Sequence, residues 1–199
     1  MLRSNFSDSN FEAGVDEAGR GSLAGPLTAS AVILPKGYRN KGLNDSKKIS
    51  PIRREILRKE IEKDAIAFSV VNIGPETIDK KNILNATFIA MNSALKKLKI
   101  QPEFVIVDGN RFKNTTDIPC KCIVKGDQKY LNIAAASILA KTYRDNTMQK
   151  LHLNYPIYKW CKNKGYGTLE HRESIIKFGR TKFHRKTYKL KEEQLKLDI

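Results

Sequence analysis

The sequence predicts an α/β fold in which a largely buried sheet is covered by helices. Two apolar runs of strand length, residues 27–34 and 104–107, contain few polar residues, which indicates strands that are buried on both faces. Residues 75–99 instead place apolar side chains at three- and four-residue intervals, the period of an amphipathic helix. The length of 199 residues suits one domain with a substantial core.

Strands and helices are expected to alternate along the chain. Strands are expected at residues 11–15, 27–34, 65–73, 103–107 and 120–124, and helices at 51–63, 75–99, from near 131 and from about 168. Ser50 suits the N-cap of the first helix and Pro51 its first position. The apolar stripe of the second helix is expected to pack in the core as one continuous row: Leu84, Phe88, Met91, Leu95 and Leu98.

The chain carries 37 Lys and Arg against 21 Asp and Glu, a formal net charge of +16. This excess predicts a polyanionic partner that is bound more weakly as salt concentration rises. Seven of the cations lie in residues 174–191, a stretch without an acid. We expect residues from about 156 onward to form a basic, helical, substrate-binding portion of the same domain, with Tyr158, Trp160 and Tyr166 as exposed aromatic side chains.

Membrane and disulfide-stabilised proteins are disfavoured. No apolar run approaches the ~18 residues that a membrane-spanning helix requires, and residues 1–6 lack the apolar core of a signal peptide. A cytoplasmic protein without a membrane partner is therefore expected. Cys120 and Cys122 are two residues apart and Cys161 stands alone, so we expect reduced thiols without a structural zinc site.

Residues 14–21, Gly-Val-Asp-Glu-Ala-Gly-Arg-Gly, combine two adjacent carboxylates with an arginine between glycines. Asp16 and Glu17 come where a strand is expected to end, and such a pair is costly to desolvate without a shared cation. The glycines let backbone N–H groups approach a phosphate closely. A metal ion would neutralise the two acids, and a phosphate would bind to the Gly-Arg-Gly sequence. This combination is typical of nucleic-acid enzymes. A solvated turn is the alternative, whereas a dinucleotide-binding loop is disfavoured because the acids would face the pyrophosphate.

Two further acids follow expected strands. Asp108 ends the apolar run 104–107, and ligands of α/β sheets gather at the carboxyl ends of strands. Asp127 lies between the strand at 120–124 and the helix that begins near 131, where the helix dipole favours an ionised carboxylate. A turn residue and a helix cap are the structural alternatives for these two acids.

Over residues 14–185 the sequence resembles the bacterial ribonuclease HII family, the type 2 ribonucleases H. The resemblance rests on six motifs that occur in order: residues 15–21 with Gly25-Pro26-Leu27, residues 43–48 (Leu-Asn-Asp-Ser-Lys-Lys), Val107-Asp108-Gly109, Lys125-Gly126-Asp127, residues 135–141 with Arg144-Asp145, and residues 165–168 with His171. Such an ordered set is highly specific, whereas any one of these motifs alone would not be.

The resemblance implies a ribonuclease H-like fold: a mixed five-stranded sheet flanked by helices, with a helical C-terminal portion. It implies four catalytic carboxylates, Asp16, Glu17, Asp108 and Asp127, that bind two Mg²⁺ or Mn²⁺ ions as cofactors. The family's substrates are RNA–DNA hybrids, whose RNA strand is cleaved, and DNA duplexes with single embedded ribonucleotides, which are cut on the 5′ side. The products carry 5′-phosphate and 3′-hydroxyl ends.

The resemblance also implies which residues bind the substrate. Gly19, Arg20 and Gly21 would contact the 2′-hydroxyl and phosphates at an RNA–DNA junction, and Tyr166 would pack on the neighbouring deoxyribose. The 2′-hydroxyl is the group that distinguishes RNA from DNA at one nucleotide, so the enzyme must contact it. Further contacts are expected from Asn44, Lys47, His171 and Arg172.

Three alternatives stay open. Ribonuclease HIII shares the fold but usually departs from the sequence at 18–21 and carries an added N-terminal domain, for which the ten residues before Phe11 leave no room. Another nuclease or integrase of this fold would ignore the 2′-hydroxyl. A non-catalytic RNA- or ribosome-binding protein would explain the charge but not the four carboxylates. The family also allows a replication clamp as a partner, although residues 190–199 contain no clear clamp-binding peptide, and a monomer is the simplest oligomeric state.

Overall fold

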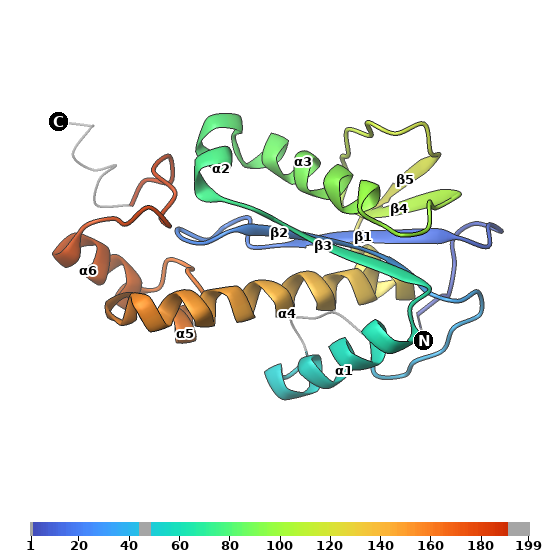
Figure 1. The fold of residues 1–199 in the computed structure, drawn as a ribbon, viewed down its shortest axis with the longest axis horizontal. Helices are drawn as coiled ribbons and strands as arrows, with labels where there is room; N and C mark the ends of the chain where they lie inside the picture. Colours follow the sequence, from blue (N-terminus) through green and yellow to red (C-terminus); the bar gives the residue numbers. More distant parts are fainter. Residues whose placement is uncertain (1, 44–48, 191–199) are drawn as a thin grey trace.

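The computed structural model describes residues 2–43 and 49–190, which are built around one mixed sheet (Figure 1). Its strands are β1 (Glu12–Ala18), β2 (Leu27–Ile33), β3 (Ala67–Ile73), β4 (Phe104–Asp108) and β5 (Cys120–Ile123). The strand order is β3-β2-β1-β4-β5. β2 pairs antiparallel with β1 and β3, whereas β4 runs parallel to β1 and β5. The expected mixed five-stranded sheet is therefore confirmed.

Helices cover both faces of the sheet (Figure 1). They are α1 (Pro51–Asp64), α2 (Pro75–Lys81), α3 (Ile83–Lys96), α4 (Leu131–Asn154), α5 (Trp160–Asn163) and α6 (Leu169–Phe178). α3 packs on β2 and β3, and the long α4 packs on β1 and β2. α1 contacts α4, and as predicted its N-cap is Ser50, whose side chain accepts a hydrogen bond from the backbone N–H of Arg53.

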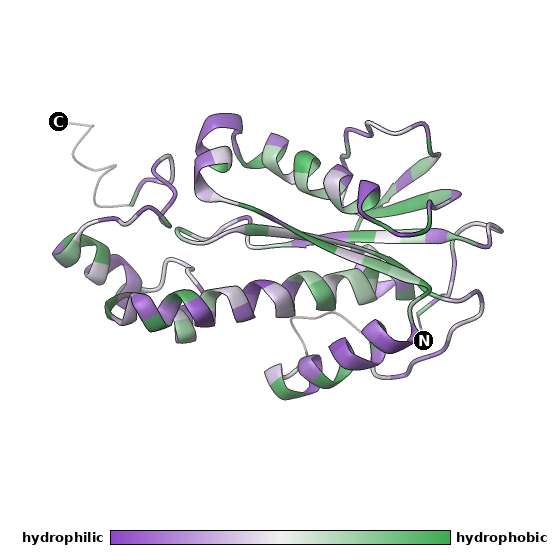
Figure 2. Ribbon diagram, viewed as in Figure 1, coloured by the Kyte–Doolittle hydropathy of each residue, from purple (hydrophilic) through white to green (hydrophobic). Residues whose placement is uncertain are grey.

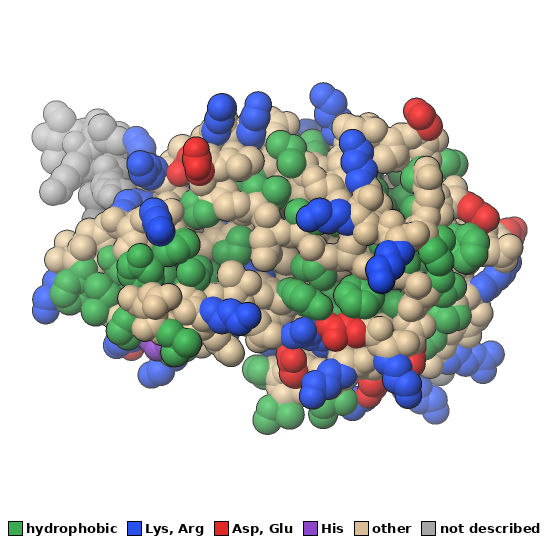
Figure 3. All heavy atoms as spheres, viewed as in Figure 1, with side chains coloured by type: hydrophobic (Ala, Val, Ile, Leu, Met, Phe, Trp, Pro, Cys, Tyr) green, Lys and Arg blue, Asp and Glu red, His purple; other side chains and the backbone are tan. Residues whose placement is uncertain are grey.

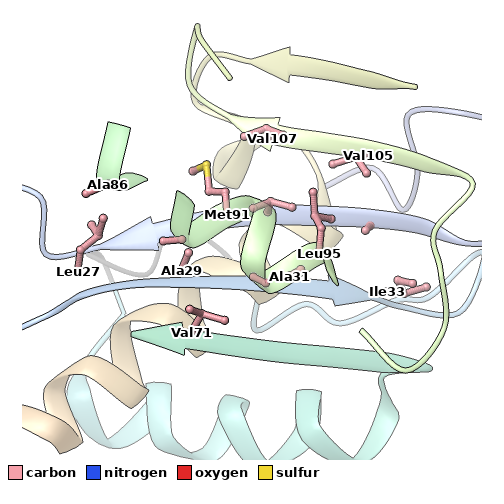
Figure 4. Packing of buried hydrophobic residues seen from close by; sticks show 14 of the residues in the cluster. Leu27, Ala29, Ala31, Ile33, Val71, Ala86, Met91, Leu95, Val105 and Val107 are labelled. Carbon is pink, nitrogen blue, oxygen red and sulfur yellow. The ribbon is translucent and has the colours of Figure 1, made fainter. Parts of the chain in front are cut away.

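Apolar clusters fill the space between the sheet and the helices on each side. One cluster joins Met91 and Leu95 of α3 to Ala31 of β2 (Figure 4). The cluster on the opposite face joins Val32 to Leu139 of α4. Successive residues of β2 therefore point into different clusters, and all of them are buried, as the apolar run predicted. Figure 2 shows hydrophobic segments, in green, in the sheet and a largely hydrophilic α1, in purple.

Gly14 on β1 lies directly against the backbone at the start of α4. A Cβ atom at this position would overlap the backbone of Asn132 and Ile133. Asn132 is fully buried, and its Oδ1 accepts a hydrogen bond from the backbone N–H of Leu34 at 3.0 Å. The absence of a side chain at Gly14 therefore lets the start of α4 sit directly on the sheet.

The predicted single helix over residues 75–99 is wrong, because α2 and α3 are separated at Asn82. Asn82 has a φ angle of 61°, and its side chain accepts a hydrogen bond from the backbone N–H of Asn85, so it caps α3. Met91 and Leu95 are buried as expected, whereas Leu84 is 38% exposed. The apolar stripe thus begins later than its spacing suggested.

Two expected surface aromatics are buried. Tyr158 and Trp160 are stacked with their ring centroids 5.1 Å apart, and they belong to an apolar cluster in the C-terminal portion. Their polar atoms are satisfied inside that portion, because the Tyr158 hydroxyl donates to the carbonyl of Gly179 and the Trp160 indole N–H donates to His171. These rings support the fold and are not available for stacking on nucleic acid.

The described part of the chain contains no helix that is long and apolar enough to cross a membrane. The three cysteines, Cys120, Cys122 and Cys161, are free thiols, as expected.

Replacing Gly14 by alanine tests the close contact between β1 and α4. We expect Gly14→Ala to lower the free energy of unfolding by about 1–3 kcal/mol, because the strand and the helix must move apart. Gly21→Ala is a matched control, since its Cβ would meet no atom within 4 Å. It should change the free energy of unfolding by less than about 0.5 kcal/mol in the same chemical denaturation experiment. A Gly14→Ala protein as stable as the wild type would contradict this account of the packing.

Candidate active site

A cavity of about 500 Å³ opens at the edge of the sheet where the parallel strands β1 and β4 end. It is lined by the four predicted carboxylates, by the end of β1 with the residues that follow it, by two residues of α4 and by one later aromatic residue: Asp16, Glu17, Ala18, Gly19, Arg20, Gly21, Asp108, Asp127, Ser137, Lys141 and Tyr166. The structure thus brings together residues from β1, β4, α4 and two loops. β1 extends to Ala18, so Asp16 and Glu17 lie within the strand and not after its end as predicted.

Asp16 is buried among other negative charges. Burial raises its pKa well above the usual value, and the carboxylates of Glu17 and Asp108 raise the pKa further. Hydrogen bonds from Ser137 and from the backbone N–H of Glu17 oppose this shift, the latter at 2.7 Å. The ionised form of Asp16 is therefore costly in this cavity unless a cation is nearby.

Glu17 lies next to Asp16 and has a basic neighbour. Burial raises the pKa of Glu17, the Arg20 guanidinium opposes the shift, and Asp108 adds to it. The Arg20 Nη1 lies 3.3 Å from the Glu17 Oε1. Because the Arg20 side chain is about half exposed, this ion pair neutralises the acids only in part.

Asp108 is the last residue of β4 and fixes the turn that carries Asp127. Its Oδ1 accepts a hydrogen bond from the backbone N–H of Gly126 at 2.7 Å. Gly126 begins a 3₁₀ turn, Gly126–Gln128, that leads into α4 and includes the buried Asp127. The two acids predicted from separate motifs are thus connected through the backbone of Gly126, and Asp127 also lines the cavity.

The side chains in the cavity suit a hard divalent cation. Carboxylate oxygens are the ligands that Mg²⁺ and Mn²⁺ prefer. Across residues 2–43 and 49–190, no group of three or more His, Cys, Asp or Glu side chains forms a ready-made metal cage. Mg²⁺ commonly needs only one or two carboxylates, since waters and substrate phosphates complete its shell. The excess negative charge around Asp16 fits such a site.

The Gly-Arg-Gly loop, residues 19–25, lies next to the acids. Gly19 has a φ angle of +93°, and a Cβ atom there would overlap the buried side chain of Arg144. Gly21 lines the cavity and has no atom within 4 Å of where its Cβ would be. The loop therefore exposes its backbone to the cavity at Gly21, as close approach of a ligand requires.

Tyr166 lines the same cavity and is 37% exposed. Its position is more tightly fixed than the flanking glycines suggested. The backbone N–H groups of Leu23 and Ala24 donate to the carbonyl of Gly165, and the Arg144 guanidinium carbon lies 5.2 Å from the Tyr166 ring centroid. The ring is thus held against the Gly-Arg-Gly loop with one part open to the cavity.

Two predicted substrate contacts do not line the cavity. His171 is fully buried, and its Nδ1 lies 2.9 Å from the carbonyl oxygen of Tyr166, so it contacts the backbone of a residue that lines the cavity. The Nε of Arg172 is buried and has no hydrogen-bond partner in the described part of the chain. The predicted contacts Asn44 and Lys47 lie outside the described residues.

Arg144 and Arg185 are functional candidates that the sequence did not single out. Arg144 was named only within a family motif, yet it is fully buried, and its neighbour Lys141 pairs with Asp145 at 2.8 Å. A sequence signal existed, because Arg144 follows Ala140 by one helical turn and shares its buried face. Arg185 was counted only as part of the basic C-terminal stretch, yet it too is fully buried.

Solved structures with the same architecture are nucleases. The ribonuclease H2 from Pyrococcus horikoshii superposes with a TM-score of 0.78 at 26% identity, covering 89% of this chain and 93% of that chain. The RNase HII in the PCNA:RNase HII complex from Archaeoglobus fulgidus gives a TM-score of 0.76 at 27% identity, covering 91% and 96%. The fold and the acidic cavity together define a nuclease with the ribonuclease H-like fold.

Sequence relatives narrow the class. The Ribonuclease HII of Christiangramia forsetii is 56% identical over 187 residues, 94% of each chain, and that of Parabacteroides distasonis is 55% identical over 197 residues, 99% of each chain. The family model described as Ribonuclease HII matches residues 13–191. The chain belongs to the ribonuclease HII family of type 2 ribonucleases H, hydrolases that cleave the RNA strand of RNA–DNA hybrids. The ribonuclease HIII and non-catalytic alternatives are thereby set aside.

The raised pKa values of Asp16 and Glu17 predict how the metal-free protein responds to pH. The folded state binds protons at these acids more tightly than the unfolded chain, which stabilises the fold below about pH 4. This stabilisation is lost as pH rises through the raised pKa values. Asp16→Asn cannot ionise but keeps an acceptor for the Glu17 N–H. In chelator, we expect it to melt at a higher temperature than the wild type at about pH 7.5, and the difference to vanish near pH 4.

Thermal melts of both proteins over this pH range measure the effect. A lower melting temperature for Asp16→Asn at the higher pH would contradict the electrostatic account of the cavity.

Proposed function

We propose that this protein is a metal-dependent endonuclease that cuts duplex DNA on the 5′ side of a single embedded ribonucleotide, leaving 5′-phosphate and 3′-hydroxyl ends. The observation that carries the proposal is the shared cavity, where the four carboxylates lie beside the Gly-Arg-Gly loop and Tyr166. The acids suit phosphodiester hydrolysis, and the loop with Tyr166 suits recognition of one sugar. An enzyme that cleaves only long RNA–DNA hybrids would have less need of the loop and Tyr166.

In the proposed reaction, Asp16, Glu17, Asp108 and Asp127 would hold two Mg²⁺ or Mn²⁺ ions next to the scissile phosphate. Such ions lower the pKa of an attacking water and stabilise the departing 3′-oxygen. The protein's own contribution is placement. β1 and β4 fix three of the acids, and the hydrogen bond between Asp108 and Gly126 fixes the turn that carries the fourth.

Recognition of the ribonucleotide would fall to the Gly-Arg-Gly loop. Backbone N–H groups and the Arg20 side chain can bind the phosphate, and the open backbone at Gly21 allows a 2′-hydroxyl to come into hydrogen-bond range. The exposed part of the Tyr166 ring would pack on the deoxyribose that follows. A duplex made only of DNA would leave the loop's donors for the 2′-hydroxyl without a partner.

The proposed partners are RNA–DNA hybrids and DNA duplexes with embedded ribonucleotides. The net charge of +16 supports backbone contacts, and Figure 3 shows Lys and Arg side chains spread over one face of the molecule. A replication clamp is a further proposed partner, because the relative from Archaeoglobus fulgidus was solved as a complex with PCNA. Residues 191–199, where a C-terminal clamp peptide would lie, are outside the described residues. We propose a cytoplasmic monomer.

The decisive experiment uses a DNA duplex with one embedded ribonucleotide, incubated with Mg²⁺, with Mn²⁺ or with chelator. We expect cleavage 5′ of the ribonucleotide with either metal and none in chelator. Asp108→Asn should lose most turnover, on the order of a hundredfold or more, because a metal ligand and the hold on the Gly126 turn are weakened. Its affinity for the duplex should stay close to that of the wild type.

Cleavage of a long hybrid without cleavage at the single ribonucleotide would refute the proposed specificity. Equal loss of duplex binding by Asp108→Asn in chelator would refute its catalytic assignment.

Two substitutions of Tyr166 test the proposed contact with the sugar. Tyr166→Ala removes the ring, and we expect it to lower kcat/KM on the single-ribonucleotide duplex by about tenfold or more, since stacking on an aromatic ring is worth ~1–3 kcal/mol per base. Tyr166→Phe keeps the ring and should retain most of the activity. Melting temperatures of both variants control for folding. An unchanged rate for Tyr166→Ala would remove the ring from substrate recognition.

A further inference from the structure

Arg185 is a buried cation that binds backbone carbonyls. Its side chain is fully buried, and it forms no ion pair with any acid in the described part of the chain. Its Nη1 donates to the carbonyl of Arg20 at 2.7 Å, and its Nη2 donates to the carbonyls of Gly19 at 2.6 Å and Gly25 at 3.2 Å. Burial lowers the pKa of Arg185, as expected for a desolvated cation. A charge in this position is costly and needs a compensating role.

The carbonyls that Arg185 binds determine where the adjacent N–H groups point. In a trans peptide the C=O and N–H bonds point in opposite directions across one plane. The carbonyls of Gly19 and Arg20 share their planes with the N–H groups of Arg20 and Gly21. Because both carbonyls point inward to Arg185, both N–H groups point the opposite way. Within the described residues neither N–H has a hydrogen-bond partner, and both residues line the acidic cavity.

The guanidinium also changes the strength of these donors. A cation on the carbonyl oxygen polarises the peptide group, and hydrogen bonds that are linked in this way strengthen each other in a poorly solvated site. The Tyr188 hydroxyl donates to the same carbonyl of Arg20 at 2.7 Å and adds to the effect. The N–H groups of Arg20 and Gly21 are thus fixed, polarised donors before any ligand binds, as preorganised recognition of an anion or hydroxyl requires.

The segment that carries Arg185 is attached to the loop by its own backbone as well. The N–H of Gly25 donates to the carbonyl of Phe183, and the N–H of Arg185 donates to the carbonyl of Leu23, both at 2.8 Å. These bonds hold the Arg185 side chain beneath the loop. The arrangement is therefore a fixed support and not a chance approach of a long side chain.

We propose that Arg185 is a positioning residue for substrate recognition: by binding the carbonyls of Gly19 and Arg20, it aims the N–H groups of Arg20 and Gly21 at the phosphate and 2′-hydroxyl of the ribonucleotide. This inference rests on the proposed function of the same cavity. Arg185 does not touch the substrate, and its effect is on the choice between ribonucleotide and deoxyribonucleotide. A purely structural role would instead affect stability and the binding of all duplexes alike.

Arg185→Lys tests the proposal, because it keeps the charge but cannot span the three carbonyls. The measurement is the affinity, in Mg²⁺, of the Asp108→Asn protein for two duplexes of the same sequence. One duplex contains a single ribonucleotide and the other is all DNA. The same affinities are measured for the protein that carries Arg185→Lys in addition to Asp108→Asn. We expect the preference for the ribonucleotide duplex to fall by about tenfold, as for loss of a charge-assisted hydrogen bond. The affinity for the all-DNA duplex should stay within about twofold of its original value.

Arg180→Lys is the matched control. The Arg180 guanidinium also donates to two backbone carbonyls in this segment, those of Arg185 at 2.9 Å and Tyr188 at 3.0 Å. Neither of these two bonds is made to the Gly-Arg-Gly loop. Arg180→Lys should lower the melting temperature while the preference for the ribonucleotide duplex is retained.

Retention of the preference by Arg185→Lys would overturn the proposal, whatever its melting temperature. If that variant does not fold, Tyr188→Phe replaces it: loss of the hydroxyl on Arg20 should reduce the preference about threefold at an unchanged melting temperature, and an unchanged preference would overturn the proposal. If the parent Asp108→Asn protein itself shows no preference, the proposed function fails. If the parent shows it and Arg185→Lys keeps it, only the role of Arg185 fails.

Discussion

The crowding of negative charge at the ends of β1 and β4 is the constraint on which the rest of the structure depends. Asp16 and Glu17 are adjacent in sequence, and Asp108 is brought against them because β4 pairs in parallel with β1. That pairing requires a long connection, and the chain between β1 and β4 supplies it with β2, α1, β3, α2 and α3. Ser137 can reach Asp16 only because Gly14 allows α4 to lie directly on β1. The sheet order, the helix packing and the glycine thus serve one acidic cavity.

The two halves of the cavity are built differently. The acids sit on strands and on a turn that is tied to a strand, so their positions follow from the sheet itself. The Gly-Arg-Gly loop lies outside the named strands, and isolated bridges join Ser22 to Tyr166 and Ala24 to His184. Two buried cations support it further: Arg185 binds the carbonyl of Gly19, and Arg144 binds those of Ala24 and Pro26. In the proposed function, the rigid strands would carry the catalytic groups, and a loop that is supported by distant residues would carry recognition, a common division in enzymes.

The sequence predicted the strands well because local signals marked them, and the four acids that it singled out line one cavity. The apolar runs of β2 and β4 and the cap at Ser50 are independent of tertiary contacts. Asn82 shows what apolar spacing cannot predict. The helices break at this polar residue, and the apolar residues around it keep the same spacing, so the pattern does not mark the break. Trp160 shows another limit, because burial of an aromatic residue in a basic stretch depends on partners far along the chain.

The buried arginines were harder to predict for a physical reason. A guanidinium that binds carbonyls needs no acidic residue, so neither charge pairing nor hydropathy marks the position. Arg144 could have been recognised from the face of α4 that it shares with Ala140. Arg185 could not, since its partners are backbone atoms of residues 19–25 and the sequence does not identify them.

The bond between Arg185 and Gly19 joins residues 166 positions apart. A protein chain is synthesised from its N-terminus, so the acidic strand β1 emerges early, whereas the support for the loop beside it emerges among the last residues described. Contacts of such long sequence separation also form late when a complete chain folds. With the positioning role proposed for Arg185, selection of a ribonucleotide would be acquired at the end of synthesis, and an incomplete chain would carry the acids without the support for the loop that recognises the substrate.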